Sequence, residues 1–109
     1  MMARALIIIP MFNEGATVAR VLDEARRAAP EADLLVIDDG STDASPDILA
    51  SYGDVHTIRH AVNAGYGASL ISGFRHAVNA GYAVAVTIDC DEQHEPVRIP
   101  EFLAAVEHA

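Results

Sequence analysis

The sequence contains no lysine, a single cysteine and no long apolar run. Without lysine the chain cannot form a Walker-type phosphate loop, which needs Gly-Lys-Ser/Thr, or the lysine-containing acidic pocket of response-regulator receivers. Because Cys90 stands alone, no disulfide can form within the chain, in agreement with a reducing compartment. The apolar runs 5–9 and 82–88 fall short of the roughly 18 residues of a spanning helix. We expect a cytoplasmic segment without a signal peptide.

Basic residues are also scarce. The chain has 7 basic and 16 acidic residues, and its formal net charge is −9 at pH 7. This balance disfavours nucleic acid or an anionic membrane surface as a partner of the segment. A length of 109 residues with 51% hydrophobic content suits one core and is too short for two. We therefore expect one domain. If it binds phosphate, it must do so through arginine, backbone amides or a metal ion, because lysine is absent.

Four short aliphatic runs predict β-strands. They are apolar on both faces, which is typical of a parallel sheet covered by helices on both sides. The predicted strands are residues 5–9, 34–37, 55–58 and 83–88. Helical spacing predicts a first helix that has Asn13 as its N-cap and ends at Pro30, and a short second helix over residues 45–52. It also predicts a third helix that ends at Gly81 and a terminal helix that begins at about Pro96. The order predicts a doubly wound, mainly parallel α/β sheet.

Polar residues follow each predicted strand, in the segments 10–14, 38–43, 63–67 and 89–94. Ligands of open α/β sheets bind beyond the carboxyl ends of the strands, so these segments predict one ligand site. Two of them carry aspartate pairs, Asp38 with Asp39 and Asp89 with Asp91. Bringing four carboxylates together is unfavourable unless a cation binds or protons are taken up. Since carboxylates select Mg²⁺ or Mn²⁺, we expect a divalent metal that admits an anionic diphosphate.

Three motifs occur in a characteristic order. They are Pro-Met-Phe-Asn-Glu at 10–14, Asp-Asp-Gly-Ser-Thr-Asp at 38–43 and Asp-Cys-Asp-Glu-Gln-His at 89–94. The sequence thereby resembles the family-2 glycosyltransferases of GT-A fold, in particular the polyprenyl- or dolichyl-phosphate mannosyl- and glucosyltransferase branch. The resemblance covers essentially the whole chain. It implies that residues 1–109 are the Rossmann-like nucleotide-sugar-binding half of a GT-A domain, without the acceptor part.

The resemblance also implies roles for individual residues. The nucleotide would be bound by Pro10, Phe12, Glu14, Asp38, Asp39 and Asp89, and the Mg²⁺ or Mn²⁺ ion by Asp89, Asp91 and Gln93. In this scheme Asp39 hydrogen-bonds the base and Asp38 supports its loop. No catalytic base is identified, because the family places it in the missing part. A phosphate acceptor needs none, since its oxygen is already deprotonated.

The implied activity is that of an inverting glycosyltransferase, a hexosyltransferase. Its donor would be a GDP- or UDP-sugar and its acceptor a polyprenyl phosphate, at the cytoplasmic face of the membrane in the full-length protein. We expect the fragment alone to be inactive. With half a sheet exposed, it is also expected to form a homodimer or to self-associate.

The sequence departs from the family pattern at three positions. Phe12 lacks the hydroxyl of the usual Tyr, Glu92 adds charge beside the second aspartate pair, and Tyr66 stands where many relatives have Lys. The loop 63–67 matches a dinucleotide fingerprint only weakly and is expected to shape a loop near the donor. Four histidines show no metal spacing and are expected on the surface: His56, His60, His76 and His108.

Three other functions stay open at this point. A non-catalytic GT-A module would bind nucleotide or a partner and would be expected to lose its carboxylates, which are present here. A nucleotidyltransferase would need a Gly-rich, basic loop after the first strand. An Asp-x-Asp phosphatase would carry its motif on the first strand, whereas here the motif follows the fourth.

Overall fold

A computed structural model of the chain describes residues 4–88. These residues form a parallel four-stranded sheet with helices on both faces, as the sequence predicts. The strands are β1 (Ala5–Met11), β2 (Asp33–Asp38), β3 (His56–Arg59) and β4 (Val84–Thr87). The helices are α1 (Val18–Ala28), α2 (Ser45–Ala50) and α3 (Tyr66–Asn79). None of these helices combines the length and the apolar character that crossing a bilayer requires.

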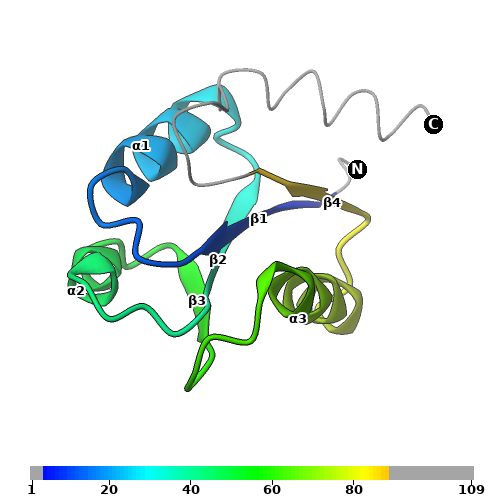
Figure 1. Ribbon diagram of the computed structural model, residues 1–109. Coiled ribbons are helices and arrows are strands. Elements are labelled where there is room, and N and C mark those ends of the chain that lie inside the picture. The colour runs from blue at the N-terminus through cyan, green and yellow to red at the C-terminus, as the bar shows by residue number, and fades with distance from the viewer. Residues whose placement is uncertain (1–3, 89–109) are drawn as a thin grey trace.

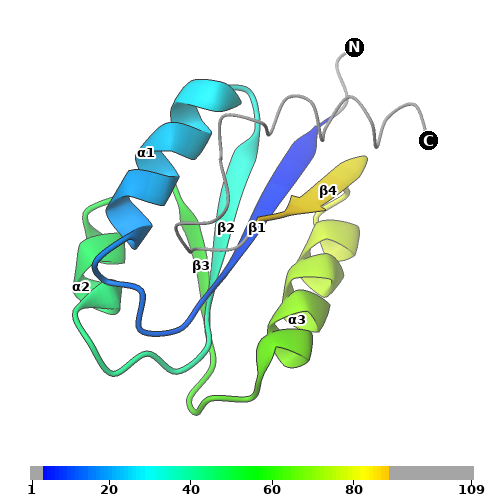
Figure 2. The same ribbon diagram turned by 45° about the horizontal axis from the view of Figure 1, so that its top comes forward.

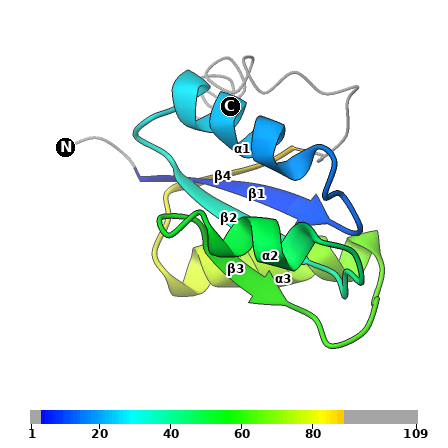
Figure 3. The same cartoon turned by 90° about the vertical axis from the view of Figure 1, so that its left-hand side faces the viewer.

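The strand order creates a topological switch point beside β1, where the connections between strands reverse direction across the sheet. The order across the sheet is β3-β2-β1-β4, and every neighbouring pair is parallel. The chain moves outward from β1 to β2 and β3, then crosses back to form β4 on the other side of β1 (Figure 1). In Figure 3 the arrowheads of β1 and β3 point the same way. The crevice beyond the carboxyl ends of β1 and β4 is therefore the expected place for a ligand.

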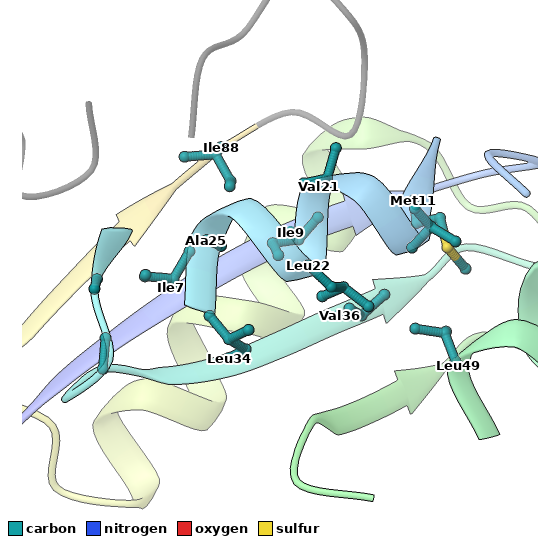
Figure 4. Close-up of a cluster of buried hydrophobic side chains, with 13 residues drawn as sticks. Ile7, Ile9, Met11, Val21, Leu22, Ala25, Leu34, Val36, Leu49 and Ile88 are labelled. Carbon is teal, nitrogen blue, oxygen red and sulfur yellow. The ribbon is translucent and has the colours of Figure 1, made fainter. Parts of the chain in front are cut away.

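The two faces of the sheet are covered by different helices. In Figures 1 and 2, α1 and α2 lie on one side and α3 on the other. Side chains alternate along the strands, so Ile7 and Ile9 point to the α1/α2 face while Leu6 and Ile8 point to the α3 face. Figure 4 shows the α1/α2 core, where Leu22 of α1 packs among aliphatic side chains of β1 and β2. Burial on both faces explains the continuous apolar runs of β1 and β2.

The α3 face is packed through small residues. The buried positions of α3 are Ser69, Gly73 and Ala77. A Cβ added to Gly73 would lie 2.5 Å from Cγ2 of Ile8. The helix therefore lies so close to β1 that no side chain fits between them at this position.

The start of α1 differs from its prediction. Asn13 was expected to cap α1, but the N-cap position is Thr17, which makes no side-chain capping bond. The Asn13 backbone is left-handed, with φ 52°, and its side chain binds the loop after β2 instead. That expectation is wrong because a tertiary partner takes the amide oxygen. The predicted terminal helix from Pro96 lies outside the described residues.

Candidate functional site

Three loops meet at the carboxyl ends of the strands. We call them the rim: residues 12–17 after β1, 39–44 after β2 and 60–65 after β3. Backbone bonds align their first residues, because the N–H of Asp39 donates to the carbonyl of Met11 at 2.9 Å and the N–H of His60 donates to that of Asp38 at 2.9 Å. The rim is therefore a continuation of the sheet.

Asn13 joins the first two loops. Its amide oxygen accepts hydrogen bonds from the N–H groups of Thr42 at 2.8 Å and Asp43 at 3.2 Å. Its own N–H donates to Oγ of Ser41 at 2.9 Å. A short polar side chain tolerates the positive φ of this position, and its oxygen supplies the acceptor that the second loop needs. Asn13 thus holds Phe12 and Glu14 beside the β2 loop.

Asp43 makes a second connection between the same loops. One carboxylate oxygen accepts the N–H and the hydroxyl of Ser45 at the start of α2, and the other accepts the N–H of Gly15 at 3.0 Å. The hydrogen bonds from Ser45 lower the pKa of Asp43, and the bond from Gly15 adds to them. The carboxylate form of Asp43 is therefore part of the folded loop.

Asp38 faces the α1/α2 side of the sheet and is 1% exposed. Its Oδ1 accepts the N–H of Ser41 at 2.9 Å. Its Oδ2 lies 3.9 Å from Nε of Arg59, and Nη2 of Arg59 donates to the carbonyl of Ser41 at 3.2 Å. Asp38 thereby closes its own loop through the N–H of Ser41.

Asp39 faces the α3 side and is 4% exposed. Its Oδ1 accepts the N–H of Ala64 and contacts Nδ1 of His60, both at 2.8 Å, and its Oδ2 accepts the N–H of Gly65 at 2.9 Å. Burial raises the pKa of Asp39, but the bonds from Ala64, His60 and Gly65 together outweigh it and bring the pKa below the ordinary value. Asp39 is therefore held as an anion at the start of α3.

Gly40 allows the second and third loops to touch. Its φ is +80°, and an added Cβ would lie 2.7 Å from the nitrogen of Asn63 and 2.8 Å from the carbonyl carbon of Val62. Only glycine combines this backbone conformation with such a close approach. The Asp-Asp-Gly sequence is thus a structural requirement of the rim.

The two aspartates of the β2 loop do not form a joint acidic cluster. Their side chains point to opposite faces, and each is already surrounded by hydrogen-bond donors. Backbone N–H groups, Arg59 and His60 contact these two carboxylates, while Asp89 and Asp91, the other pair of the expected metal site, lie outside the described residues. Within residues 4–88, no group of three or more His, Cys, Asp or Glu side chains could hold a metal ion.

The remaining predicted site residues divide into those on the rim and those beyond it. Pro10 is buried in β1, Phe12 is 44% exposed, and Glu14 is half-buried beside Thr17. Asp89, Asp91 and Gln93 lie outside the described residues. The last described residue, Ile88, donates its N–H to the carbonyl of Ile8 at 3.0 Å, so the chain reaches the end of β4 next to β1.

Sequence reasoning missed two side chains. His60 was expected on the surface, but it is half-buried, with its ring between Asp39 and Oγ of Ser72. His76 was also expected there and is half-buried near His56 and Tyr82, whereas His56 is exposed as predicted. The only feature of the sequence that could have indicated a buried role for His60 is its position directly after a predicted strand and shortly before Asn-Ala-Gly.

Comparison with known proteins agrees with this geometry. Residues 6–109 match the family model described as glycosyl transferase family 2. The undecaprenyl-phosphate mannosyltransferase of Micrococcus luteus is 38% identical over 97% of this chain, which covers 45% of that protein. The chain therefore spans about half the length of this curated relative.

Solved structures share the fold. Glucosyl-3-phosphoglycerate synthase from Mycobacterium tuberculosis, solved with Mn²⁺, UDP and glucosyl-3-phosphoglycerate, is 25% identical and superposes with a TM-score of 0.69; the match covers 90% of this chain and 37% of that one. A mannosyltransferase from Pyrobaculum calidifontis, solved with GDP-Man and Mn²⁺, gives 22% identity and a TM-score of 0.69, over 84% and 28% of the two chains. The family match, the strand order and the rim agree, and the chain belongs to glycosyl transferase family 2.

Proposed function

We propose that the rim is the donor site of an inverting glycosyltransferase that takes a sugar from a nucleoside-diphosphate sugar. The observation that carries the proposal is the hydrogen-bonded connection of three strand-end loops beside the switch point between β1 and β4. Of the side chains assigned to the nucleotide by family resemblance, those within residues 4–88 stand on these loops or at the strand ends that lead into them. A preorganised rim binds a ligand without first paying for the ordering of its loops.

Each rim residue has a defined part in this proposal. The exposed ring of Phe12 offers a stacking surface for the base, for which its missing hydroxyl is not needed. Glu14 and Pro10 border the base and ribose from the β1 side, and Asp38 supports the β2 loop. The hydrogen bonds within the rim use three of the four acceptor positions of Asp39, which leaves one on Oδ2 for a base N–H.

The diphosphate requires positive charge that the rim lacks. Asp89, Asp91 and Gln93 come after β4 in the sequence, and Asp89 is also assigned to the nucleotide. Two carboxylates and an amide oxygen are a donor set that suits Mg²⁺ or Mn²⁺. Such an ion supplies Lewis-acid stabilisation of the departing nucleoside diphosphate. Mn²⁺ in the two solved relatives supports this proposal.

The proposed acceptor is a polyprenyl phosphate, supported by the name of the Micrococcus luteus relative. A phosphate oxygen is already nucleophilic, so attack from the face opposite the leaving group needs no base in this chain. With such an acceptor the full-length enzyme would work at the cytoplasmic face of a membrane. β3 and β4 are the edge strands of the sheet within residues 4–88, which supports self-association of the 109-residue chain.

Calorimetric titration tests the donor site. The chain is titrated with UDP, GDP and their sugar conjugates, with and without Mn²⁺. We expect one nucleotide to bind in a metal-dependent way, and Asp91→Ala to weaken that binding at least tenfold. Glu95→Ala removes a nearby carboxylate that lies outside the Asp-x-Asp-x-Gln pattern and serves as the matched control, with affinity unchanged.

The titration together with activity assays separates the alternatives. Absence of binding with or without metal would contradict the donor site. Nucleotide binding in a full-length protein that transfers no sugar to polyprenyl phosphate would favour the non-catalytic module. Release of phosphate from a phosphomonoester would instead point to the Asp-x-Asp phosphatase, and transfer of a nucleotidyl group to the nucleotidyltransferase.

A further inference from the structure

We propose that His60 is a positioning residue of the donor site, which holds the Asp39 carboxylate in the orientation that base recognition needs. The inference rests on the proposed function, because it concerns how the donor site is organised. Its starting point is a chain of three side chains from three different elements. Asp39 follows β2, His60 follows β3, and Ser72 lies in α3.

The geometry of the chain is continuous. Nδ1 of His60 lies 2.8 Å from Oδ1 of Asp39, and Nε2 lies 2.9 Å from Oγ of Ser72. The side chain of His60 is 19% exposed and that of Asp39 is 6% exposed. Both ring nitrogens are therefore engaged, and the imidazole cannot rotate without breaking a contact at one end.

The contact with His60 completes a cage around one carboxylate. The N–H groups of Ala64 and Gly65 hold the two oxygens from the start of α3, and His60 approaches Oδ1 from the β3 side. Without the imidazole, the carboxylate would be held from one side only. One acceptor position on Oδ2 remains available for the base. Because the two oxygens belong to one rigid carboxylate, the direction of that position depends on how Oδ1 is held.

The order Asp-His-Ser is also that of a hydrolase triad, but the surroundings argue against nucleophilic catalysis. Ser72 lies in the interior of α3, a 14-residue helix. The N–H groups beside it are bonded within the helix and cannot form an oxyanion hole. The unit is therefore suited to fixing Asp39 rather than to attacking a substrate.

Two conservative variants separate the two ends of the imidazole. The amide nitrogen of Asn can occupy the place of Nδ1, so His60→Asn keeps a donor to Asp39 and loses the contact with Ser72. The longer Gln places its amide near the position of Nε2, so His60→Gln keeps the contact with Ser72 and loses the one with Asp39. His56→Gln, at an exposed position of β3, is the matched control.

The first readout is nucleotide affinity in the full chain, measured by calorimetry with Mn²⁺. We expect His60→Gln to weaken binding of the preferred nucleotide about tenfold. His60→Asn should stay within about threefold of the wild type, Ser72→Ala should lose about threefold, and His56→Gln should lose nothing. A merely structural role would instead lower the unfolding temperature equally in His60→Asn and His60→Gln, with equal affinities.

The second readout does not depend on ligand. Amide hydrogen exchange at Ala64 and Gly65 should be faster in His60→Gln than in His60→Asn, because only the latter retains the cage around Asp39. A wild type that binds no nucleotide would overturn the proposed function and this inference with it. A wild type that binds, together with a His60→Gln variant of equal affinity, would overturn the inference alone.

Discussion

The two faces of the sheet are built in different ways. On the α1/α2 face, large aliphatic side chains such as Leu22 and Val36 fill a continuous core. On the α3 face, Gly73 and Ala77 bring the helix close to the strands, and the polar unit of Asp39, His60 and Ser72 runs along its edge. The α1/α2 face stabilises the fold by burying large apolar side chains, and the α3 face holds polar groups in fixed positions.

Because of this difference, one face of the sheet mainly determines the stability of the domain and the other mainly positions the proposed ligand site. A core of large side chains loses stability when volume is removed, but it does not touch the predicted ligand. A helix packed through small residues tolerates no added volume, and any shift of it moves the loop 60–65. Changes on the two faces should therefore have different consequences for folding and for nucleotide binding.

The largest expected effect is on the α1/α2 face. Leu22 is 1% exposed, and Leu22→Ala should lower the free energy of unfolding by about 3 kcal/mol, because it removes buried methyl groups and leaves a cavity. Urea denaturation measures this loss. Leu22→Met conserves volume and should cost less than about 1.5 kcal/mol. Equal losses in the two variants would show that volume does not decide stability there.

A smaller effect is expected at Asp39. At pH 7, Asp39→Asn should cost about 2 kcal/mol, since two N–H groups and His60 lose their anionic acceptor. The pKa of Asp39 is lower in the folded than in the unfolded chain, so its stabilisation is present above the unfolded pKa and disappears as pH falls through the folded pKa.

The difference between wild type and Asp39→Asn should therefore narrow from pH 7 to strongly acidic pH. Urea denaturation at a series of pH values checks it. Glu31→Gln, at an exposed position before β2, should change stability little at any pH. A difference in unfolding free energy between wild type and Asp39→Asn that stays constant across the pH series would contradict the lowered pKa of Asp39.

The smallest expected effect is at Gly73. Gly73→Ala adds a Cβ that meets Ile8, and the overpacking should outweigh the gain in helix propensity, for a net loss of about 1 kcal/mol. Gly67→Ala, in the same helix, has nothing within 4 Å of its Cβ and should gain up to about 1 kcal/mol. Thermal unfolding of the pair checks the contrast, which fails if both variants gain stability.

Local pattern was sufficient for most of the fold. The apolar runs of β1 and β2 and the helical spacing of α1 and α3 predicted the element order, because a segment buried on both faces cannot be polar. Element ends were less accurate: β1 extends to Met11 and α2 ends at Ala50, two residues from the predicted limits in each case. These ends depend on partners such as Asp38 of β2, which pairs with Met11.

The sequence by itself determined the α/β class, the parallel sheet and the positions of the polar strand ends, since these follow from periodicity and residue type. Tertiary structure decided what the polar residues do. Asn13 became a link between loops instead of a cap, adjacent aspartates turned to opposite faces, and a histidine expected on the surface became a partner of Asp39. Hydrogen bonds between residues 12 to 29 positions apart decide these roles, and such pairings exist only once the strands are aligned.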